Sequence, residues 1–435
     1  MRLAWPITVS MLSYSTMTLV DTLFVGRLGS AALAGVGLGG ISTWALICFS
    51  LGLLRGAKVL VSQAVGAGKR EEIGMVLGAT VLWAVALGAV TVAAGWIAAP
   101  LLPSLAATPA AGDAAVEYFR VRTIGAPVVM LFWGTREVRQ GLGDTRWPMV
   151  ASVCANVVNV ALDYALIFGL GLGVTGAAAA SVAASAVELG LLVALTRSPN
   201  GHGVGWRHLK ALWWVGWPSG MELVVEMGSF TALTVLISRF SEVHMAAHQV
   251  ALQVLHFSFL PAFAISDAAS VLAGQAVGAG RLSLVPRVAR LAMVAAGIYT
   301  AACSLSFVLC GRAISGLFTD SLDLAQLATR LLWVAAVFQV ADAGAMVARG
   351  VLRGTGDVRY PAVVGTLAAW ALTPPAMWLL GYHAGLGALG GWIGISMELL
   401  VTCTAFWLRL SRGRWHAAAA RARSIATDGG LSLVS

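Results

Sequence analysis

Long apolar runs follow one another along the whole chain, and short clusters of Gly, Pro and charged residues separate them. Each run holds roughly 20 residues, the length that an α-helix needs to cross a bilayer. The predicted spans lie near 4–25, 33–58, 74–98, 116–137, 147–169, 174–195, 212–238, 245–268, 287–311, 325–348, 361–380 and 388–409. The pattern therefore predicts an all-α integral membrane protein with twelve transmembrane helices.

The composition of the chain favours a lipid environment. Hydrophobic residues make up 59% of the 435 residues and charged residues 11%, whereas about 25% of residues are charged in ordinary soluble domains. Such a chain has too little polar surface to cover a soluble globule. The five cysteines show no ligand spacing, so we expect small packing residues rather than disulfides or a metal site.

The basic residues are distributed unevenly over the linkers. Nineteen of the 28 Lys and Arg residues lie after even-numbered spans or in the tail, and six lie after odd-numbered spans. Because positive charge is retained in the cytoplasm, we expect cytoplasmic termini and a location in the plasma (inner) membrane. This topology accounts for the net charge of +9, and nucleic-acid binding would need a basic soluble domain, which the pattern does not contain.

The chain contains two copies of one six-span unit. Three motifs recur with a constant separation of 212 or 213 residues: Trp5-Pro6 and Trp217-Pro218, QAVGAGK at 63–69 and QAVGAGR at 275–281, and GDTRWP at 143–148 and GDVRYP at 356–361. We therefore expect an N-lobe at 1–211, a C-lobe at 212–410 and a basic cytoplasmic tail at 411–435. Parallel repeats favour a transporter whose lobes rock against each other, and the alternative is a packing relic of gene duplication.

Several long motifs follow the order found in one transporter family. The first half contains LVDTLFVGRLGSAALAGVGL, LVSQAVGAGK and QGLGDTRWP, and the second contains GWPSGMELVVE, LAGQAVGAGR and ARGVLRGTGDVRYP. In these motifs the chain resembles multidrug and toxic compound extrusion (MATE) transporters, over essentially its whole length before the tail. The resemblance implies a twelve-helix efflux antiporter with two six-helix lobes, driven by H⁺ or Na⁺.

Ionisable residues inside the predicted spans are candidates for function, because a charge at mid-membrane costs about 2.5–3.5 kcal/mol on insertion scales. Asp21 lies in the first span, and its alternative role is to cap a helix or to pair with Arg27. Asn156, Asn159 and Asp163 lie on one face of the fifth span. Their oxygens suit a hard cation, and neighbouring carboxylates in an apolar site can carry a proton.

The resemblance assigns roles to some of these residues. Asp21, Asn159 and Asp163 match the N-lobe cation site of one branch of the family, which implies a site for H⁺ or for Na⁺. Ser181 in the sixth span matches a hydroxyl residue of that branch. The alternative role of Ser181 is packing in an Ala-rich helix.

The C-lobe has carboxylates of its own. Glu222 and Glu226 are four residues apart on the seventh span, so both can face one cavity. The resemblance matches Glu226 and Asp342 to the C-lobe cation-binding carboxylates of another branch. The sequence therefore leaves the coupling ion and its lobe open, and we favour H⁺ at the N-lobe.

Arg55 and Lys58 lie in the second span, where the family pattern has small or apolar residues. The 212-residue separation makes Asp267 the equivalent of Arg55. This suggests that Arg55 and Asp267 form a gate that closes the cytoplasmic side in the outward-open state. The alternative is that Arg55 and Lys58 extend to the lipid headgroups.

Other polar residues give weaker signals. His244 and His248 have a metal-ligand spacing but no acidic third ligand nearby, so we expect no metal site. Glu137 lies between two arginines at a helix end, which predicts an interfacial ion pair. Glu188 and Glu398 lie in the last span of each lobe, where they either line the cavity or anchor loops.

We therefore expect a MATE-type antiporter, not an enzyme, that exports small organic cations in exchange for H⁺ or Na⁺ without a cofactor. We expect a monomer that contacts membrane lipids and binds no nucleic acid. One alternative is a lipid or lipid-linked oligosaccharide flippase of the same superfamily, which would favour a basic cavity. Another is an intramembrane enzyme or receptor, but the sequence shows no nucleophile–base pair.

Overall fold

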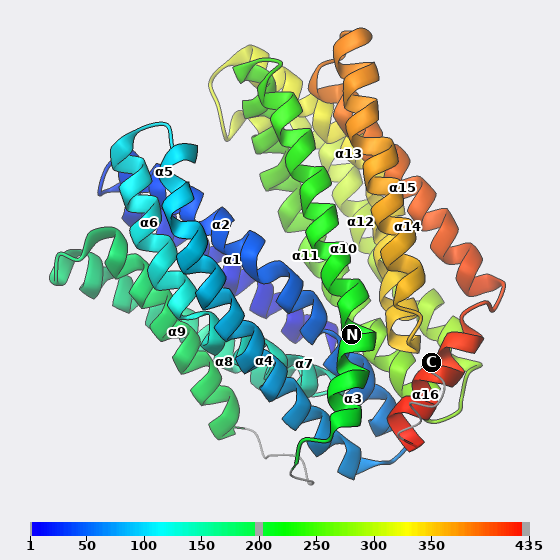
Figure 1. Cartoon of the computed structure of the whole chain (residues 1–435). Helices are drawn as coiled ribbons and strands as arrows, with labels where there is room; N and C mark the ends of the chain where they lie inside the picture. The colour runs from blue at the N-terminus through cyan, green and yellow to red at the C-terminus, as the bar shows by residue number, and fades with distance from the viewer. Residues whose placement is uncertain (1, 196–202, 429–435) are drawn as a thin grey trace. The chain divides into compact units, whose positions relative to one another are not determined.

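The computed structural model describes residues 2–195 and 203–428, and all regular elements in these two ranges are helices (Figure 1). The prediction of an all-α protein is therefore confirmed for the described part of the chain. Residues 196–202 of a predicted linker, with Arg197, and residues 429–435 of the predicted tail lie outside the described residues.

The first repeat runs from α1 to α9. Its elements are α1 (Ala4–Gly26), α2 (Ser30–Leu54), α3 (Gly56–Gly66), α4 (Arg70–Ala98), η1 (Ala99–Leu101), α5 (Leu102–Leu105), α6 (Pro109–Ile124), α7 (Ala126–Gly141), α8 (Arg146–Asp163), η2 (Tyr164–Gly169) and α9 (Gly173–Leu195).

The second repeat runs from α10 to α15, and α16 follows it. Its elements are α10 (Trp206–Ser238), α11 (Glu242–Gly278), α12 (Leu284–Gly316), α13 (Leu322–Thr355), α14 (Arg359–Ala376), η3 (Met377–His383), α15 (Ala388–Ser411) and α16 (His416–Asp428).

Ten helical segments of the described chain are long and apolar enough to cross a membrane. They are Ser30–Gly66, Arg70–Leu105, Arg146–Gly169, Gly173–Leu195, Trp206–Ser238, Glu242–Gly278, Leu284–Gly316, Leu322–Thr355, Arg359–His383 and Ala388–Ser411. The two remaining predicted spans, 4–25 and 116–137, coincide with α1, which is rich in Ser and Thr, and with the α6–α7 pair, which is interrupted at Gly125.

The helix limits repeat along the chain as the motifs do. α8 and α14 begin and end 213 residues apart, and each continues into a π-helical turn, η2 or η3. The α2–α3 pair and α11 are 212 residues apart at both ends. The copies differ in continuity, because α2–α3 is interrupted at Arg55 and α6–α7 at Gly125, whereas α11 and α13 run without a break.

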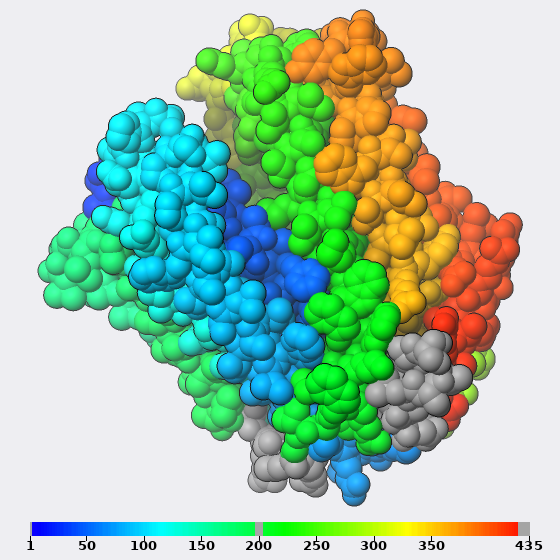
Figure 2. Space-filling model, viewed as in Figure 1, coloured from blue at the N-terminus to red at the C-terminus, as the bar shows by residue number. Residues whose placement is uncertain are grey.

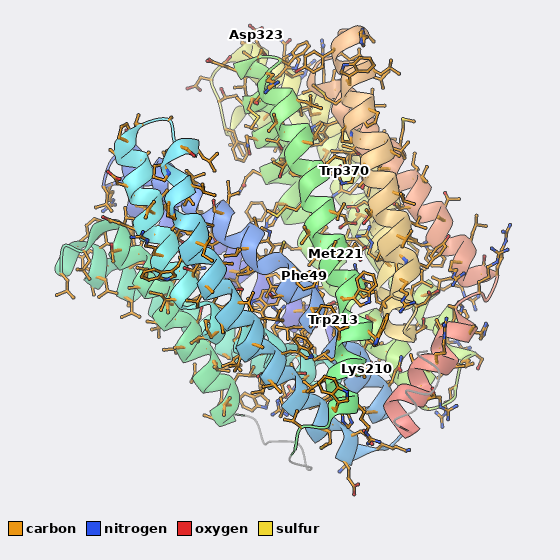
Figure 3. All side chains as sticks on the ribbon, viewed as in Figure 1. Phe49, Lys210, Trp213, Met221, Asp323 and Trp370 are labelled. Atoms are coloured by element: carbon orange, nitrogen blue, oxygen red, sulfur yellow. The ribbon has the colours of Figure 1, made fainter. Side chains whose placement is uncertain are left out.

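The chain forms two compact units, mainly residues 6–220 and 221–424, whose boundary lies within α10. The first part of α10 belongs to the first unit because it packs closely on α2. A Cβ atom on Gly220 would lie 2.7 Å from the carbonyl oxygen of Phe49. The rings of Phe49 and Trp213 are in contact, with centroids 6.3 Å apart (Figure 3). A small residue is therefore needed where the two backbones approach.

α4 meets protein on one side and exposes apolar side chains on the other. Toward α7 it carries small residues, and a Cβ atom on Gly88 would lie 2.5 Å from the Cα atom of Pro127. The outer surface of α4, light blue in Figure 2, exposes Leu82, Val85 and Val90. An apolar helix surface of this kind suits contact with lipid.

α13 packs against α11, α12 and α15 in the second unit (Figure 1). Glycine permits the approach to α11, since a Cβ atom on Gly350 would lie 2.6 Å from the carbonyl oxygen of Ser266. The packing fixes the rotation of α13, and this rotation decides where its charged residues point.

Candidate functional site

The two predicted aspartates of the first repeat lie together. Asp21 on α1 and Asp163, the last residue of α8, share a side-chain hydrogen bond. Asp163 is fully buried and Asp21 is partly buried. Two carboxyl groups can share a hydrogen bond only when one of them carries a proton. The pair therefore has the chemistry of a site that binds and releases a proton.

A polar face of α8 leads away from this pair. It holds the predicted Asn156, Asn159 and Asp163, and it extends one turn further, to Ser152; all four are buried. Asn156 donates a hydrogen bond of 2.6 Å from Nδ2 to the Ser13 hydroxyl of α1. The predicted stripe is therefore one buried face of α8 that packs toward α1. The missed Ser152 has the same spacing signal, since it precedes Asn156 by four residues.

The other candidates near the pair differ from the expectation. Ser181 is buried on α9, and its hydroxyl donates to the carbonyl oxygen of Ala177 at 3.1 Å, within its own helix. Arg122 is a site residue that the sequence analysis misses, because it counts this residue among the linker charges. It lies on α6 and interacts electrostatically with both Asp21 and Asp163.

Glu188 forms a second buried site in the first repeat. Its side chain on α9 accepts hydrogen bonds from the Tyr14 hydroxyl at 2.7 Å and the Ser152 hydroxyl at 2.5 Å. Arg136 of α7 interacts electrostatically with Glu188, and its guanidinium lies 4.6 Å from the ring centroid of Trp133. Of the two roles left open for Glu188, loop anchoring does not fit, since its partners lie on helices.

Two glutamates face two arginines in the second repeat. Arg349 lies 2.8 Å from Glu226 and 3.4 Å from Glu222, and Arg353 forms an ion pair with Glu222. Both pairs of like residues are four residues apart, on α10 and on α13, so the two helices present matching rows of charge. The sequence analysis finds the glutamate spacing but misses the equal spacing of Arg349 and Arg353, which it places in a linker.

The remaining C-lobe candidates join the same cluster. Asp342 on α13 interacts electrostatically with Arg349, Glu398 and Glu226, and Thr373 donates to Glu398 at 2.5 Å. The structure therefore brings the predicted Glu222, Glu226 and Asp342 together, with the Arg349 guanidinium among them.

Lys58 and Glu137 correct two predictions. Lys58 Nζ lies 3.0 Å from Glu137 Oε2, and their side chains are only 5% and 3% exposed. Lys58 also lies 3.4 Å from the Gln140 side-chain oxygen. The interfacial ion pair predicted for Glu137 is wrong, since its partner is a lysine 79 residues away in a buried site. Extension of Lys58 to the headgroups is also wrong, because the ammonium group is held inside the first unit.

Arg55 and Asp267 are partly buried, Arg55 at the break between α2 and α3 and Asp267 on α11. Arg55 belongs to the first unit and Asp267 to the second. The gate between them stays a prediction.

The two histidines of α11 have structural partners. His244 Nδ1 accepts a hydrogen bond from the Ala388 amide at 2.9 Å, and His248 Nδ1 accepts one from the Trp392 indole at 3.0 Å. Both bonds connect α11 with the start of α15. Within residues 2–195 and 203–428, no group of three His, Cys, Asp or Glu residues could hold a metal ion.

The fold and these clusters define a class of protein: a polytopic helical membrane protein built from two repeats, with buried ionisable groups in each. Soluble enzymes do not bury so many charges in apolar helices, whereas transporters place ion and substrate sites there.

Comparison with known proteins gives the family. The MatE family profile matches residues 6–165 and 218–379, one segment in each repeat. The chain belongs to the MatE (MATE) family, so it is a membrane transporter and not an enzyme. The prediction of the family from the sequence motifs is confirmed.

Relatives match over nearly their whole length. A "Probable multidrug resistance protein NorM" of Pseudomonas syringae pv. tomato is 30% identical over 426 residues, which cover 93% of this chain and 92% of that protein. A protein of the same name from Burkholderia mallei is 33% identical over 423 residues, 92% of this chain and 89% of that protein.

Solved structures share the fold. An outward-facing multidrug resistance MATE family transporter of the MOP superfamily superposes with a TM-score of 0.88 at 23% identity, covering 96% of this chain and 95% of that one. A MOP superfamily transporter from Pyrococcus furiosus superposes with a TM-score of 0.86 at 24% identity, with coverage of 96% and 95%. The twelve-helix MATE fold is therefore confirmed.

Proposed function

We propose that this protein is a secondary active multidrug efflux antiporter that exchanges H⁺ for small organic cations by alternating access. Its relatives in two bacterial genera are called multidrug resistance proteins, and they match more than nine-tenths of this chain. We place it as a monomer in the plasma membrane with both termini in the cytoplasm, in keeping with the bias of basic linkers.

The Asp21–Asp163 hydrogen bond carries the choice of H⁺ as the coupling ion. The pair belongs to the first repeat alone, since the equivalent positions of the second repeat hold Leu233 and Ala376. A shared hydrogen bond between two carboxyl groups contains a proton by its nature. Protonation of the second carboxylate would leave the pair neutral, and loss of its proton would leave an anion that attracts a cationic substrate.

The C-lobe cluster supports the same assignment. A cation at Glu222 and Glu226 would have to compete with Arg349, whose charge already lies within 2.8–3.4 Å of both. A tethered guanidinium is more favourable there than a free Na⁺, because it loses less entropy on binding and forms directed hydrogen bonds. We therefore assign Glu226, Asp342 and Glu222 to the structure of the lobe or to substrate contact, and coupling to the first repeat.

Efflux of a fluorescent organic cation such as ethidium from proteoliposomes tests the proposal. A pH gradient should drive ethidium against its concentration gradient; each charge moved across about 100 mV supplies roughly 2.3 kcal/mol, enough for more than tenfold accumulation. A Na⁺ gradient of equal size at uniform pH should give the rate of protein-free liposomes. Efflux that follows the Na⁺ gradient, or neither gradient, would contradict the proposal.

The proposed gate has its own test. Asp267→Arg places like charges at the two predicted positions and should reduce efflux to background, and adding Arg55→Asp should restore at least about a tenth of it, because opposite charges are then paired again in reverse order. A double variant as inactive as Asp267→Arg would rule out the pair.

A further inference from the structure

Glu188 is a buried carboxylate for which the proposed exchange has no role so far. Its side chain is 2% exposed, and each of its two oxygens accepts a hydrogen bond, one from Tyr14 and one from Ser152. An ordinary packing position in an apolar helix gains nothing from a carboxylate, because burying the group is expensive. The retained acid, with donors already oriented toward it, therefore requires an explanation.

A continuous polar path connects Glu188 with the aspartate pair. Ser152, which donates to Glu188, and Asp163 lie on the same buried face of α8, eleven residues apart. This separation corresponds to about 16 Å along a helix. Asn156 and Asn159 lie between them on that face, and Asn156 contacts Ser13, the neighbour of Tyr14 in the chain.

The repeat gives a second, independent observation. The 212- and 213-residue separations make Glu226 the equivalent of Tyr14, and Arg349 the equivalent of Arg136. Each repeat therefore places a buried arginine against a buried glutamate at the same position, Arg136 beside Glu188 and Arg349 beside Glu226. In the second repeat the arginine forms a direct ion pair, whereas in the first repeat the oxygens of the glutamate are bound to hydroxyl groups.

We infer that Glu188 is a second proton-binding carboxylate, which relays protons between the Asp21–Asp163 pair and the Arg146 end of α8. This inference rests on the proposed function and extends it from one proton site to a path through the first repeat. By the distribution of basic linkers, the Arg146 end faces the cytoplasm, so Glu188 is the acceptor from which a proton leaves inward.

The surroundings of Glu188 suit a group that changes protonation. α1 contributes Tyr14 and α8 contributes Ser152, both as hydrogen-bond donors, and α7 contributes the charge of Arg136. α6 contributes Arg122, which acts electrostatically on Tyr14, and η2 packs at the far, Asp163 end of the path. Hydroxyl groups can turn to donate to a carboxylate or to accept from a carboxylic acid, so both forms of Glu188 can be satisfied.

Two transport modes separate a relay from a structural role. Net efflux driven by a pH gradient requires proton transfer, whereas exchange of labelled for unlabelled ethidium at uniform pH does not. Glu188→Gln should lower driven efflux at least tenfold and leave exchange within about twofold of the wild type, since Gln keeps the size of the side chain. Glu188→Asp, which keeps the carboxyl group, should recover part of driven efflux.

Glu117→Gln is the matched control, because Glu117 is an exposed acid of the same repeat that also accepts a hydrogen bond from α9, from Thr175 at 3.4 Å. It should leave both modes unchanged. Equal loss of both modes in Glu188→Gln would show a structural role, and retention of both would show no role; either overturns the relay. If Asp21→Asn abolishes driven efflux while Glu188→Gln retains it, the relay alone fails, whereas wild-type protein that ignores the pH gradient refutes the proposed function itself.

Tyr14→Phe serves if Glu188→Gln does not fold. It removes one donor that favours the ionised carboxylate, so the pH of half-maximal driven efflux should rise by roughly half a unit to one unit. Exchange should not change. An unaltered pH profile would overturn the relay.

Discussion

Asp21→Asn is expected to abolish driven efflux, bringing the rate in a pH gradient to that of protein-free liposomes. Asn has nearly the shape of Asp, so α1 keeps its packing, but the amide cannot take up or release a proton near neutral pH. The hydrogen bond to Asp163 can still form, and this isolates the loss of titration from a loss of structure. The measurement is ethidium efflux in proteoliposomes, with thermal unfolding in detergent to confirm folding.

Asp323→Asn is the control for this experiment, because Asp323 is an exposed acid at the start of α13 (Figure 3). It should retain wild-type efflux. Asp163→Asn should match Asp21→Asn, and the double variant should be no worse than either, since members of one functional unit are not additive. Wild-type efflux by Asp21→Asn would remove the pair from the mechanism.

Lys58→Met is expected to lower the free energy of unfolding by about 3–5 kcal/mol, the cost of leaving one member of a buried ion pair without its partner. Met keeps the length of the lysine stem, so the loss arises from the uncompensated Glu137 carboxylate, which is almost fully buried. The measurement is reversible unfolding in mixed micelles. Lys58→Met combined with Glu137→Leu should recover most of the stability, because an apolar pair replaces the ionic one.

The Arg207–Glu72 pair provides the comparison. Its two atoms lie 2.7 Å apart, but the Arg207 side chain is 44% exposed, so Arg207→Ala should cost no more than about 1 kcal/mol. Equal losses for Lys58→Met and Arg207→Ala would show that Lys58 and Glu137 are hydrated and that their burial has no energetic consequence.

The sequence by itself determined the spans, the repeat and the family. An apolar run of membrane length has one stable outcome in lipid, because the backbone must satisfy its own hydrogen bonds there. The stripe of Asn156, Asn159 and Asp163 was predictable for a similar reason, since helical spacing alone puts these residues on one face. Local periodicity needs no knowledge of neighbouring helices.

Only the tertiary structure decided which charges meet. Glu137 has arginines next to it in sequence, yet it pairs with Lys58, and Glu188 finds its donors on α1 and α8. Arg349 lies among the acids of the second repeat only because glycines bring α13 close to α11 and fix its rotation. The direction of a side chain on a buried helix depends on the packing of every helix around it, and no spacing within one segment contains that information.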